Sequence, residues 1–360
     1  MKYEPRKLKI SYTPYHLIFK EPAGTSRGIL REKLTYLIKV SSVDNPERCG
    51  YGEAAIFPGL SKETPKELSQ RLEQIVSSGE YFFSPGRYEM SCLQFGLETA
   101  VANLSHGDQL VFPSHFTRQE SEIIINGLIW MGDFEMMKTR ISQKLDSGFS
   151  CIKVKIGSID WEKELALIKY LRHSGGDDII IRVDANGAFT PDNVLYKLEE
   201  LAEFNVHSIE QPIAAGQWNE MKKLCRVSPI PVALDEELIG IPPGNERNRL
   251  LEEISPSFLI LKPALCGGFT GSTDWIERAR KYDIGWWITS ALESSIGLNA
   301  ISQFTATLSP EIPQGLGTGN LFINNFTSPL TLKGERLCYY CYERELNSYR
   351  SELKNLNWIN

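Results

Sequence analysis

From about residue 122 the chain alternates short apolar runs, rich in Ile and Val, with amphipathic helical windows. Strands that are apolar throughout indicate a parallel sheet covered by helices, and seven or eight such units are most simply closed into a (β/α)7-8 modified TIM barrel. The expected strands are 123–129, 151–156, 179–184, 206–210, 231–235, 258–262, 285–290 and 314–317. The expected helices are 134–147, 160–173, 191–204, 217–226, 246–253, 271–282 and 296–308.

An open, doubly wound α/β sheet is the alternative architecture. Such a sheet usually carries a glycine-rich phosphate loop after its first strand. The segment after the first expected strand, INGLIWMGD, contains no GxGxxG motif. The closed barrel is therefore the favoured α/β fold.

Residues 1–118 have a different pattern, in which two alternating strand segments precede two helical ones. Strands followed by helices predict an α+β domain that caps the barrel. Two segments rich in small residues, 20–28 and 50–60, are expected to be loops of this capping domain. The chain regains strand-like, aromatic character from Asn325 onward, so 325–360 is expected to pack back on the capping domain. The barrel then spans 119–324.

Five charged residues end successive expected strands of the barrel, at intervals of 25 to 29 residues: Lys155, Asp184, Glu210, Asp235 and Lys262. A charge at the end of a buried strand is costly unless it is paired or binds a metal. The carboxyl ends of barrel strands meet at one mouth, where active sites of such barrels form. The sequence therefore predicts that these five side chains converge on an active site.

Three carboxylates that face one point repel one another, and a divalent cation relieves that repulsion. An all-oxygen ligand set favours Mg²⁺, with Mn²⁺ as a possible substitute, and no His or Cys beside Asp184, Glu210 or Asp235 supports zinc. Each acid alone could equally cap a helix or pair with an arginine. Three acids in register favour a metal site.

The two flanking lysines suggest proton transfer. Lys153 lies two residues before Lys155 and shares its face of the strand, and both are set among apolar residues. Burial and a like-charged neighbour lower the pKa of a lysine, which lets it act as a base near neutral pH. Lys262 belongs to a distant strand and is expected to face Lys155 across a ligand.

Composition excludes several other classes of function. The net charge of −6 is spread along the chain, which argues against a nucleic-acid partner, and no apolar stretch approaches the length of a membrane span. The N-terminal segment has no apolar signal core, so a cytoplasmic location is expected. Seven cysteines, an odd number, suit reduced structural thiols, and the isolated CxxC at Cys338 and Cys341 is more consistent with packing than with zinc.

The chain resembles the enolase superfamily, in its muconate-lactonizing subgroup. The resemblance covers essentially the whole chain and is carried by KVK at 153–155, DAN at 184–186, EQP at 210–212, DE at 235–236 and Lys262. It implies that loops 20–28 and 50–60 close over the barrel mouth and select the substrate. No histidine lies near the ends of the sixth or seventh strands, which disfavours a site like that of mandelate racemase.

The segment expected to end the barrel indicates which members of the muconate-lactonizing subgroup the chain resembles most. Dipeptide epimerases carry an Asp-x-Asp there that binds an ammonium group, whereas this chain has GLGTGNLF at 315–322. Together with SALESSIG at 290–297, this segment is similar to the o-succinylbenzoate synthases of menaquinone biosynthesis. That similarity implies loss of water from a small cyclohexadiene carboxylate. A racemase of N-acylamino acids or an epimerase of dipeptides is the alternative, and a non-catalytic homologue is disfavoured because both lysines and all three acids are present.

The resemblance also implies roles for individual residues. Lys155 would remove the proton beside the substrate carboxylate, Lys262 would stabilise the enediolate, and Lys153 would favour the metal-bound carboxylate. Asp184, Glu210 and Asp235 would bind Mg²⁺. The remaining implied site residues are Asn186 and Glu236 beside the metal ligands, and Ser290, Glu293, Gly317, Thr318, Gly319 and Arg27 around the substrate. The oligomeric state is left open.

Overall fold

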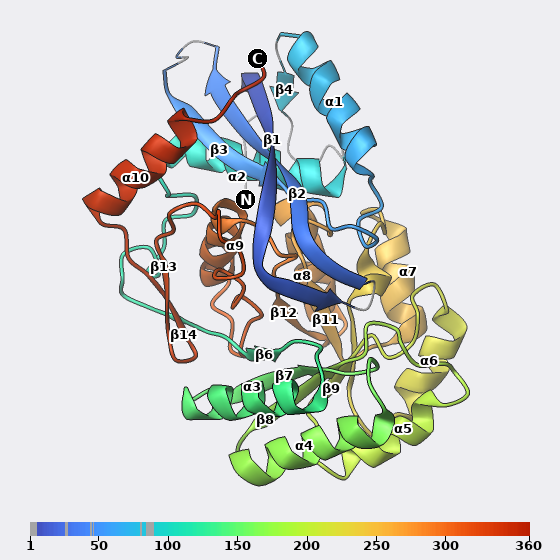
Figure 1. Ribbon diagram of the computed structural model, residues 1–360. Coiled ribbons are helices and arrows are strands. Elements are labelled where there is room, and N and C mark those ends of the chain that lie inside the picture. Colours follow the sequence, from blue (N-terminus) through green and yellow to red (C-terminus); the bar gives the residue numbers. More distant parts are fainter. Residues whose placement is uncertain (1–5, 26–27, 44, 46, 80, 84–89) are drawn as a thin grey trace.

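A seven-stranded parallel sheet forms the centre of the computed structural model, which describes the chain apart from residues 1–5, 26–27, 44, 46, 80 and 84–89 (Figure 1). The strands follow one another around the sheet in chain order, as repeated βα units require. They are β6 (Gly127–Ile129), β7 (Cys151–Lys155), β8 (Ile180–Asp184), β9 (Ser208–Glu210), β10 (Val232–Leu234), β11 (Phe258–Leu261) and β12 (Gly285–Ile288).

The expected eighth strand, 314–317, forms two isolated bridges instead of a strand. Gln314 bridges to Ile125 beside β6, and Gly315 bridges to Thr289 beside β12, both in parallel orientation. Two further backbone bonds, from Gly315 N to Ile288 O and from Asn126 N to Gln314 O, span the same gap. This short segment therefore joins the first and last strands of the sheet and closes the barrel, which confirms the predicted α/β fold.

The expected first strand, 123–129, is broken into two strands at Asn126. β5 (Ile123–Ile124) pairs antiparallel with β14 (Arg336–Tyr339) near the C-terminus, whereas β6 pairs with β7. β14 lies outside the barrel sheet and β7 lies in it, so one straight strand could not pair with both. The chain therefore bends between β5 and β6. The prediction of a single strand was wrong for this reason.

Helices follow the strands and cover the outside of the barrel (Figure 1). They begin and end within a few residues of the expected positions: α3 (Phe134–Asp146), α4 (Trp161–Gly175), α5 (Val194–Ala202), α6 (Trp218–Val227), α7 (Asn245–Ile254), α8 (Gly268–Lys281) and α9 (Ser295–Thr307). In α3, Asp133 caps the first turn by accepting from Met136 N, and Met137 and Ile141 face the core at helical spacing. No helix among the described residues is both long enough and apolar enough to cross a membrane.

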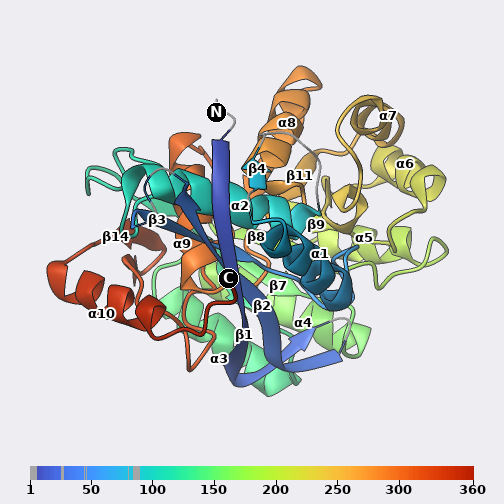
Figure 2. The same cartoon turned by 90° about the horizontal axis from the view of Figure 1, so that it is seen from above.

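An antiparallel four-stranded sheet with two helices forms the N-terminal cap, seen from above in Figure 2. Its elements are β1 (Arg6–Thr25), β2 (Gly28–Ser42), β3 (Cys49–Ala54), α1 (Pro65–Ser77), β4 (Tyr81–Phe83) and α2 (Ser91–His106). β3 packs closely on α2, since a Cβ at Gly50 or Gly52 would lie 2.1 Å from a helix carbonyl oxygen. α2 in turn contacts the barrel, where Glu98 accepts a hydrogen bond from Thr270 N of α8.

Segment 20–28 is strand at its described residues 20–25 and 28, which corrects the prediction of a loop there, whereas 50–60 is strand as far as Ala54 and is loop and turn from 55 to 60, as predicted. β1 and β2 form one long hairpin with a register shift between Ile18 and Ala23, and β3 extends to Ala54. The hairpin extends as far as the segment that follows the barrel-closing residues 314–315, where Phe19 bridges Phe322. Small residues in 20–28 thus permit an irregular strand pair and not an open loop.

The C-terminal segment contacts both parts of the molecule. β13 (Leu330–Lys333) and β14 extend β5, and the chain end returns to the cap, where Tyr12 and Ile359 exchange two backbone hydrogen bonds. Between them lies α10 (Glu343–Lys354), where strand-like structure was expected; its buried Tyr349 and Leu353 are four residues apart, the spacing of one helix face. We propose that 1–118 with 325–360 and 119–324 are the two domains.

None of the seven cysteines, all of which lie within the described residues, forms a disulfide. Cys338 Sγ lies 3.2 Å from Glu122 Oε1, whereas Cys341 Sγ lies 3.8 Å from Gln109 Oε1. The two thiols of the CxxC motif therefore have different partners.

Candidate active site

The five charged residues lie at the carboxyl ends of five adjacent barrel strands. Lys155, Asp184 and Glu210 are the last residues of β7, β8 and β9, whereas Asp235 and Lys262 directly follow β10 and β11. Lys155 is the register partner of Asp184, and Asp184 is the register partner of Glu210. Because neighbouring parallel strands end in register, the side chains meet at one mouth.

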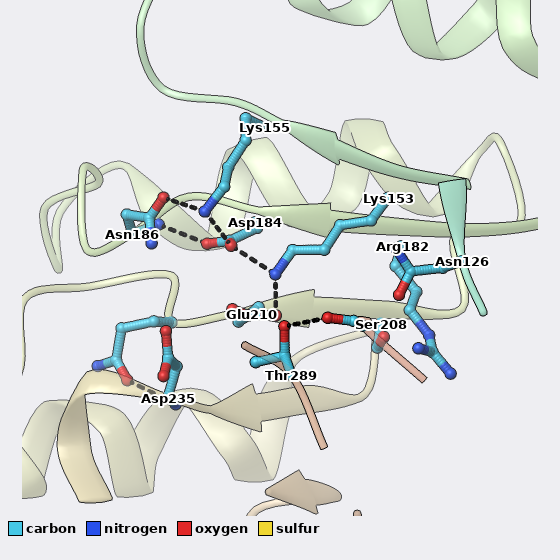
Figure 3. A network of polar contacts seen from close by, with 12 residues as sticks. Asn126, Lys153, Lys155, Arg182, Asp184, Asn186, Ser208, Glu210, Asp235 and Thr289 are labelled. Carbon is cyan, nitrogen blue, oxygen red and sulfur yellow. Dashed lines mark hydrogen bonds and ion pairs between the residues drawn. The ribbon is translucent and has the colours of Figure 1, made fainter. Parts of the chain in front are cut away.

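Lysines bind the three carboxylates directly. Lys153 Nζ lies 2.7 Å from Asp184 Oδ2 and 2.6 Å from Glu210 Oε2. Lys155 Nζ approaches the same oxygen of Asp184 from another side, at 2.6 Å (Figure 3). Lys262 pairs with Asp235. The acids and lysines thus form one charge network at the base of the mouth.

Two further predicted residues join this network. Asn186 Oδ1 accepts a hydrogen bond of 2.7 Å from Lys155, while its amide nitrogen donates to Glu236 Oε1 at 3.0 Å. Asn186 N also donates to Asp184 Oδ1, and Asn186 has a left-handed φ of 45°. An asparagine tolerates that conformation better than most residues, so DAN places an amide beside the lysine where other side chains would be strained.

Burial and mutual charge set the protonation of the network. Burial raises the pKa of Glu210, Asp184 raises it further, and the result is about 8. Burial opposes the charge of Lys153, but Asp184 and Glu210 outweigh it and raise the pKa of Lys153 to about 12. For Asp184 the nearby lysines outweigh burial and hold its pKa well below the usual range. The neighbouring lysines therefore favour the anion of Asp184, whereas burial and the charge of Asp184 favour the protonated form of Glu210.

The donor set fits a hard divalent cation, although the carboxylates are bound to lysines in this structure. Among the described residues, no three acidic, histidine or cysteine side chains are arranged to hold a metal directly. Glu210 Oε1 nevertheless lies buried without a hydrogen-bond partner, beside the paired carboxylate of Asp184. A buried carboxylate oxygen without a partner is unfavourable, and a cation would satisfy it. Asp184, Glu210 and Asp235 thus offer an all-oxygen set suited to Mg²⁺.

A cavity opens above the network, and its walls come from both the barrel and the cap. Lys153, Lys155, Asn186 and Lys262 line its base. Of the residues predicted to bind substrate, Ser290, Gly317 and Thr318 line it as well. The hydroxyl groups of Ser290 and Thr318 lie 2.6 Å apart, so two chain segments meet there.

Two of the residues predicted to bind substrate, Glu293 and Gly319, do not line the described cavity. Glu293 lies behind the cavity wall with 0% of its surface exposed, and its carboxylate accepts from Ala291 N. Gly319 lies beside the wall, where its carbonyl accepts from Asn325. Arg27 lies outside the described residues. The sequence motif could not show that Glu293 points into the protein interior and away from the cavity, because the turn at residues 291–293 decides the direction of its side chain.

Several cavity residues were not predicted from the sequence. Asn126 and Thr289 contribute polar groups, and the amide oxygen of Asn126 is buried without a hydrogen-bond partner. The unpredicted apolar wall residues include Phe57, Leu60, Leu128, Trp130, Met131 and Trp287. Most lie near the carboxyl ends of expected strands or in the expected 50–60 loop, so strand position was the available signal.

Comparisons with known proteins agree with this geometry. Residues 136–334 match the family model described as enolase C-terminal domain-like. The o-succinylbenzoate synthase of Desulfotalea psychrophila is 42% identical over 91% of this chain and 98% of its own. The chain therefore belongs to the enolase superfamily, as the sequence motifs predicted.

A solved structure and a more distant relative show how similar this chain is to other members of the superfamily. The crystal structure of MenC from Desulfotalea psychrophila LSv54 has a TM-score of 0.81 at 38% identity and covers 92% of this chain and 99% of that one. The N-succinyl-L-Arg/Lys racemase of Bacillus cereus is 26% identical over 79% of each chain. The predicted resemblance to o-succinylbenzoate synthases is thus confirmed as a likeness along nearly the whole chain.

Proposed function

We propose that this chain is an o-succinylbenzoate synthase, which dehydrates 2-succinyl-6-hydroxy-2,4-cyclohexadiene-1-carboxylate with Mg²⁺ in menaquinone biosynthesis. One observation carries the proposal: three lysines and no acidic residue line the described cavity. Such a cavity suits a substrate with two carboxylates and no ammonium group. The Desulfotalea relative of the same name supports this choice.

Asp184, Glu210 and Asp235 would hold the Mg²⁺, and Asn186 and Glu236 would hold neighbouring groups in place through their hydrogen bond. When bound, the cation would supply positive charge to the three carboxylates and stabilise negative charge on the oxygens of the substrate carboxylate. Lys153 supplies part of that charge in this structure, at Asp184 and Glu210. Beside the substrate it would favour the carboxylate oxygens in the same way.

Lys155 would be the base. It lies at the end of β7, lines the cavity and is held by Asp184 and Asn186. In its neutral form, Lys155 Nζ would take the proton from the carbon that bears the carboxylate, which leaves an enediolate. The electron pair of the enediolate would then form a third ring double bond, between the carbon that bears the carboxylate and the carbon that bears the hydroxyl. The C–O bond to that hydroxyl would break, and the proton on Lys155 would leave with the hydroxide as water. One proton and one hydroxide are thus lost, and the ring becomes aromatic.

Lys262 would stabilise the enediolate as a cation. The pKa of Lys262 is raised because Asp235 and other acids outweigh the effect of burial, so it remains protonated. It reaches the same cavity from β11, four strands beyond β7 in the sheet order. A cation beside a conjugated ring gains from its π-electrons and from the developing negative charge.

The succinyl arm would extend toward Ser290, Gly317 and Thr318. The two hydroxyl groups donate hydrogen bonds without adding negative charge, and Gly317 has no side chain to exclude the arm. Apolar side chains such as Trp130 and Leu128 would contact the ring. Arg27 stays a candidate for the arm's carboxylate on the sequence argument alone, whereas Glu293 is not proposed as a contact.

A racemase of N-acylamino acids is the second candidate. The observation that favours it is that Lys155 and Lys262 enter one cavity from separate strands, an arrangement that could move a proton from one face of a carbon to the other. The Bacillus cereus relative supports this alternative. A dipeptide epimerase fits less well because no acid lines the described cavity to bind an ammonium group. The cytoplasmic location expected from the sequence is part of this proposal.

The test is a direct assay of both reactions. Purified protein with Mg²⁺ is mixed with the cyclohexadiene substrate, and loss of the diene absorbance is followed. The proposal expects complete conversion to o-succinylbenzoate. Lack of dehydration, together with deuterium exchange at the α-carbon of an N-succinylamino acid, would replace the leading function with the alternative.

A further inference from the structure

Lys33 is a buried lysine of the cap that no step of the proposed reaction uses. It lies on β2 with 1% of its surface exposed. Its Nζ donates hydrogen bonds to Ala291 O at 2.8 Å and to Leu292 O at 2.6 Å, both in the barrel. Ala291 and Leu292 line the cavity and directly follow Ser290. The ammonium group of a cap strand therefore holds two consecutive carbonyls of the cavity wall.

The conformation of Leu292 explains why this wall needs to be held. Its φ is 59°, in the left-handed region that a leucine rarely adopts. Such a conformation is strained and persists only where its surroundings fix it. The side chain of Leu292 packs in a cluster with Leu17 and Phe19 of the cap hairpin, so the cap holds both its side chain and its carbonyl.

A second cap residue fixes the adjoining part of the wall. Glu53 of β3 accepts hydrogen bonds from Ser294 Oγ at 2.5 Å and from Gly297 N at 3.1 Å, at the start of α9. Thr35 Oγ1 of β2 donates to the other oxygen of Glu53 at 2.8 Å. The cap thus supplies a donor for the carbonyls before α9 and an acceptor for the amides that begin it.

The buried carboxylates near the wall depend on the positive charge of Lys33. Burial lowers the pKa of Lys33, while the nearby carboxylates of Glu293 and Glu53 oppose that change. Burial likewise raises the pKa of Glu293, to about 7. Removing the ammonium group would leave these buried acids without their nearby positive charge and the two carbonyls without their donor.

We propose that Lys33 is a positioning residue: from the capping domain it sets the geometry of the wall segment 290–292, and through it the affinity for the arm of the substrate. This inference rests on the proposed function for the identity of that arm. It assigns no contact between Lys33 and substrate. The cap therefore contributes to the binding site by supporting its wall as well as through the residues that line the cavity.

The test compares Lys33→Met, which keeps the length of the side chain, with Lys39→Met. Lys39 is a half-buried lysine of the same strand that lies over the ring of Trp358, away from the wall. Steady-state kinetics give KM and kcat, and hydrogen exchange with mass spectrometry follows peptides that span 290–297 in the substrate-free protein. Lys33→Met is expected to raise KM at least tenfold, to leave kcat within threefold and to speed exchange in 290–297. Lys39→Met is expected to leave KM, kcat and exchange in 290–297 unchanged.

Thr35→Val perturbs the second anchor more mildly and serves if Lys33→Met does not fold. It is expected to raise KM about threefold and to speed exchange in the same peptides. A folded Lys33→Met protein with KM within twofold of wild type and unchanged exchange would overturn the proposal. So would a Lys33→Met protein that does not fold, together with wild-type exchange in Thr35→Val.

The exchange measurement needs no substrate. If the wild-type protein fails to convert the cyclohexadiene carboxylate, the proposed function fails while exchange in 290–297 still decides the positioning role. If the wild-type protein is active and exchange is unchanged in both variants, only the positioning role fails.

Discussion

Replacing Lys153 with Met tests whether the lysine acts as the counter-charge of the carboxylates. The ammonium group lies within 2.7 Å of both Asp184 and Glu210, and the two acids are 0% and 2% exposed. Met keeps most of the volume and removes the charge. Two neighbouring buried carboxylates would then have lost their shared partner.

The expected loss of stability follows from these contacts. Removal of one partner from a buried ion pair costs about 3–5 kcal/mol. Asp184 keeps Lys155 at 2.6 Å, and Glu210, whose pKa is already raised to about 8, can hold a proton. Both effects reduce the cost, so the free energy of unfolding is expected to fall by about 3 kcal/mol in metal-free protein at pH 7.

Urea unfolding with and without Mg²⁺ measures the effect. Because the cation would supply the missing positive charge, Mg²⁺ is expected to stabilise Lys153→Met more than wild type. Lys223→Met is the control, since its exposed pair with Glu220 is worth about 1 kcal/mol or less. A metal-free loss no larger than that of Lys223→Met, or equal stabilisation of both proteins by Mg²⁺, would refute the reasoning.

Two further predictions concern the metal and a buried acid. Chelation with EDTA is expected to lower turnover at least a hundredfold and to leave the circular dichroism unchanged, with activity restored by Mg²⁺; turnover that survives chelation would contradict the metal site. The pKa of Glu293 is raised from 4.5 to about 7, so the folded state binds this proton more tightly than the unfolded state does. The resulting contribution to the free energy of unfolding is full below pH 4.5 and is lost as the pH rises through about 7. Urea unfolding between pH 5 and 8 should show the advantage of wild type over Glu293→Gln falling by about 3 kcal/mol with rising pH, because each pKa unit is worth about 1.4 kcal/mol. A difference independent of pH would show that Glu293 does not hold a proton in the folded state.

The sequence predicted the barrel and the meeting of its charged strand ends because both follow from local pattern. Apolar runs and helical windows repeat along the chain, and strand ends in register place Lys155 beside Asp184 whatever the loops do. It could not predict that Asn126 ends one strand pairing and begins another, since the partner strand lies more than 200 residues away. Nor could it show that Glu293 is buried near the charge of Lys33, because that depends on how the cap packs on the barrel.

Dependence on distant parts of the chain also explains why the structure of the capping segments was predicted wrongly. Small residues in 20–28 suggested a loop, yet 23–25 pair with 28–30 in a long irregular hairpin. Aromatic residues before 343 suggested strands, yet the following residues have helical spacing and form α10. In each case a distant partner or a change of period decided the structure.

Turnover by Lys155→Ala tests the central claim most directly, because that claim assigns the removal of the proton beside the carboxylate to one amine. The measurement is loss of the diene absorbance with saturating Mg²⁺, after circular dichroism has shown that the variant is folded. General base catalysis contributes on the order of 10²–10⁴-fold, so turnover is expected to fall by about 10³-fold or more. Activity within tenfold of wild type would contradict the assignment of Lys155 as the base.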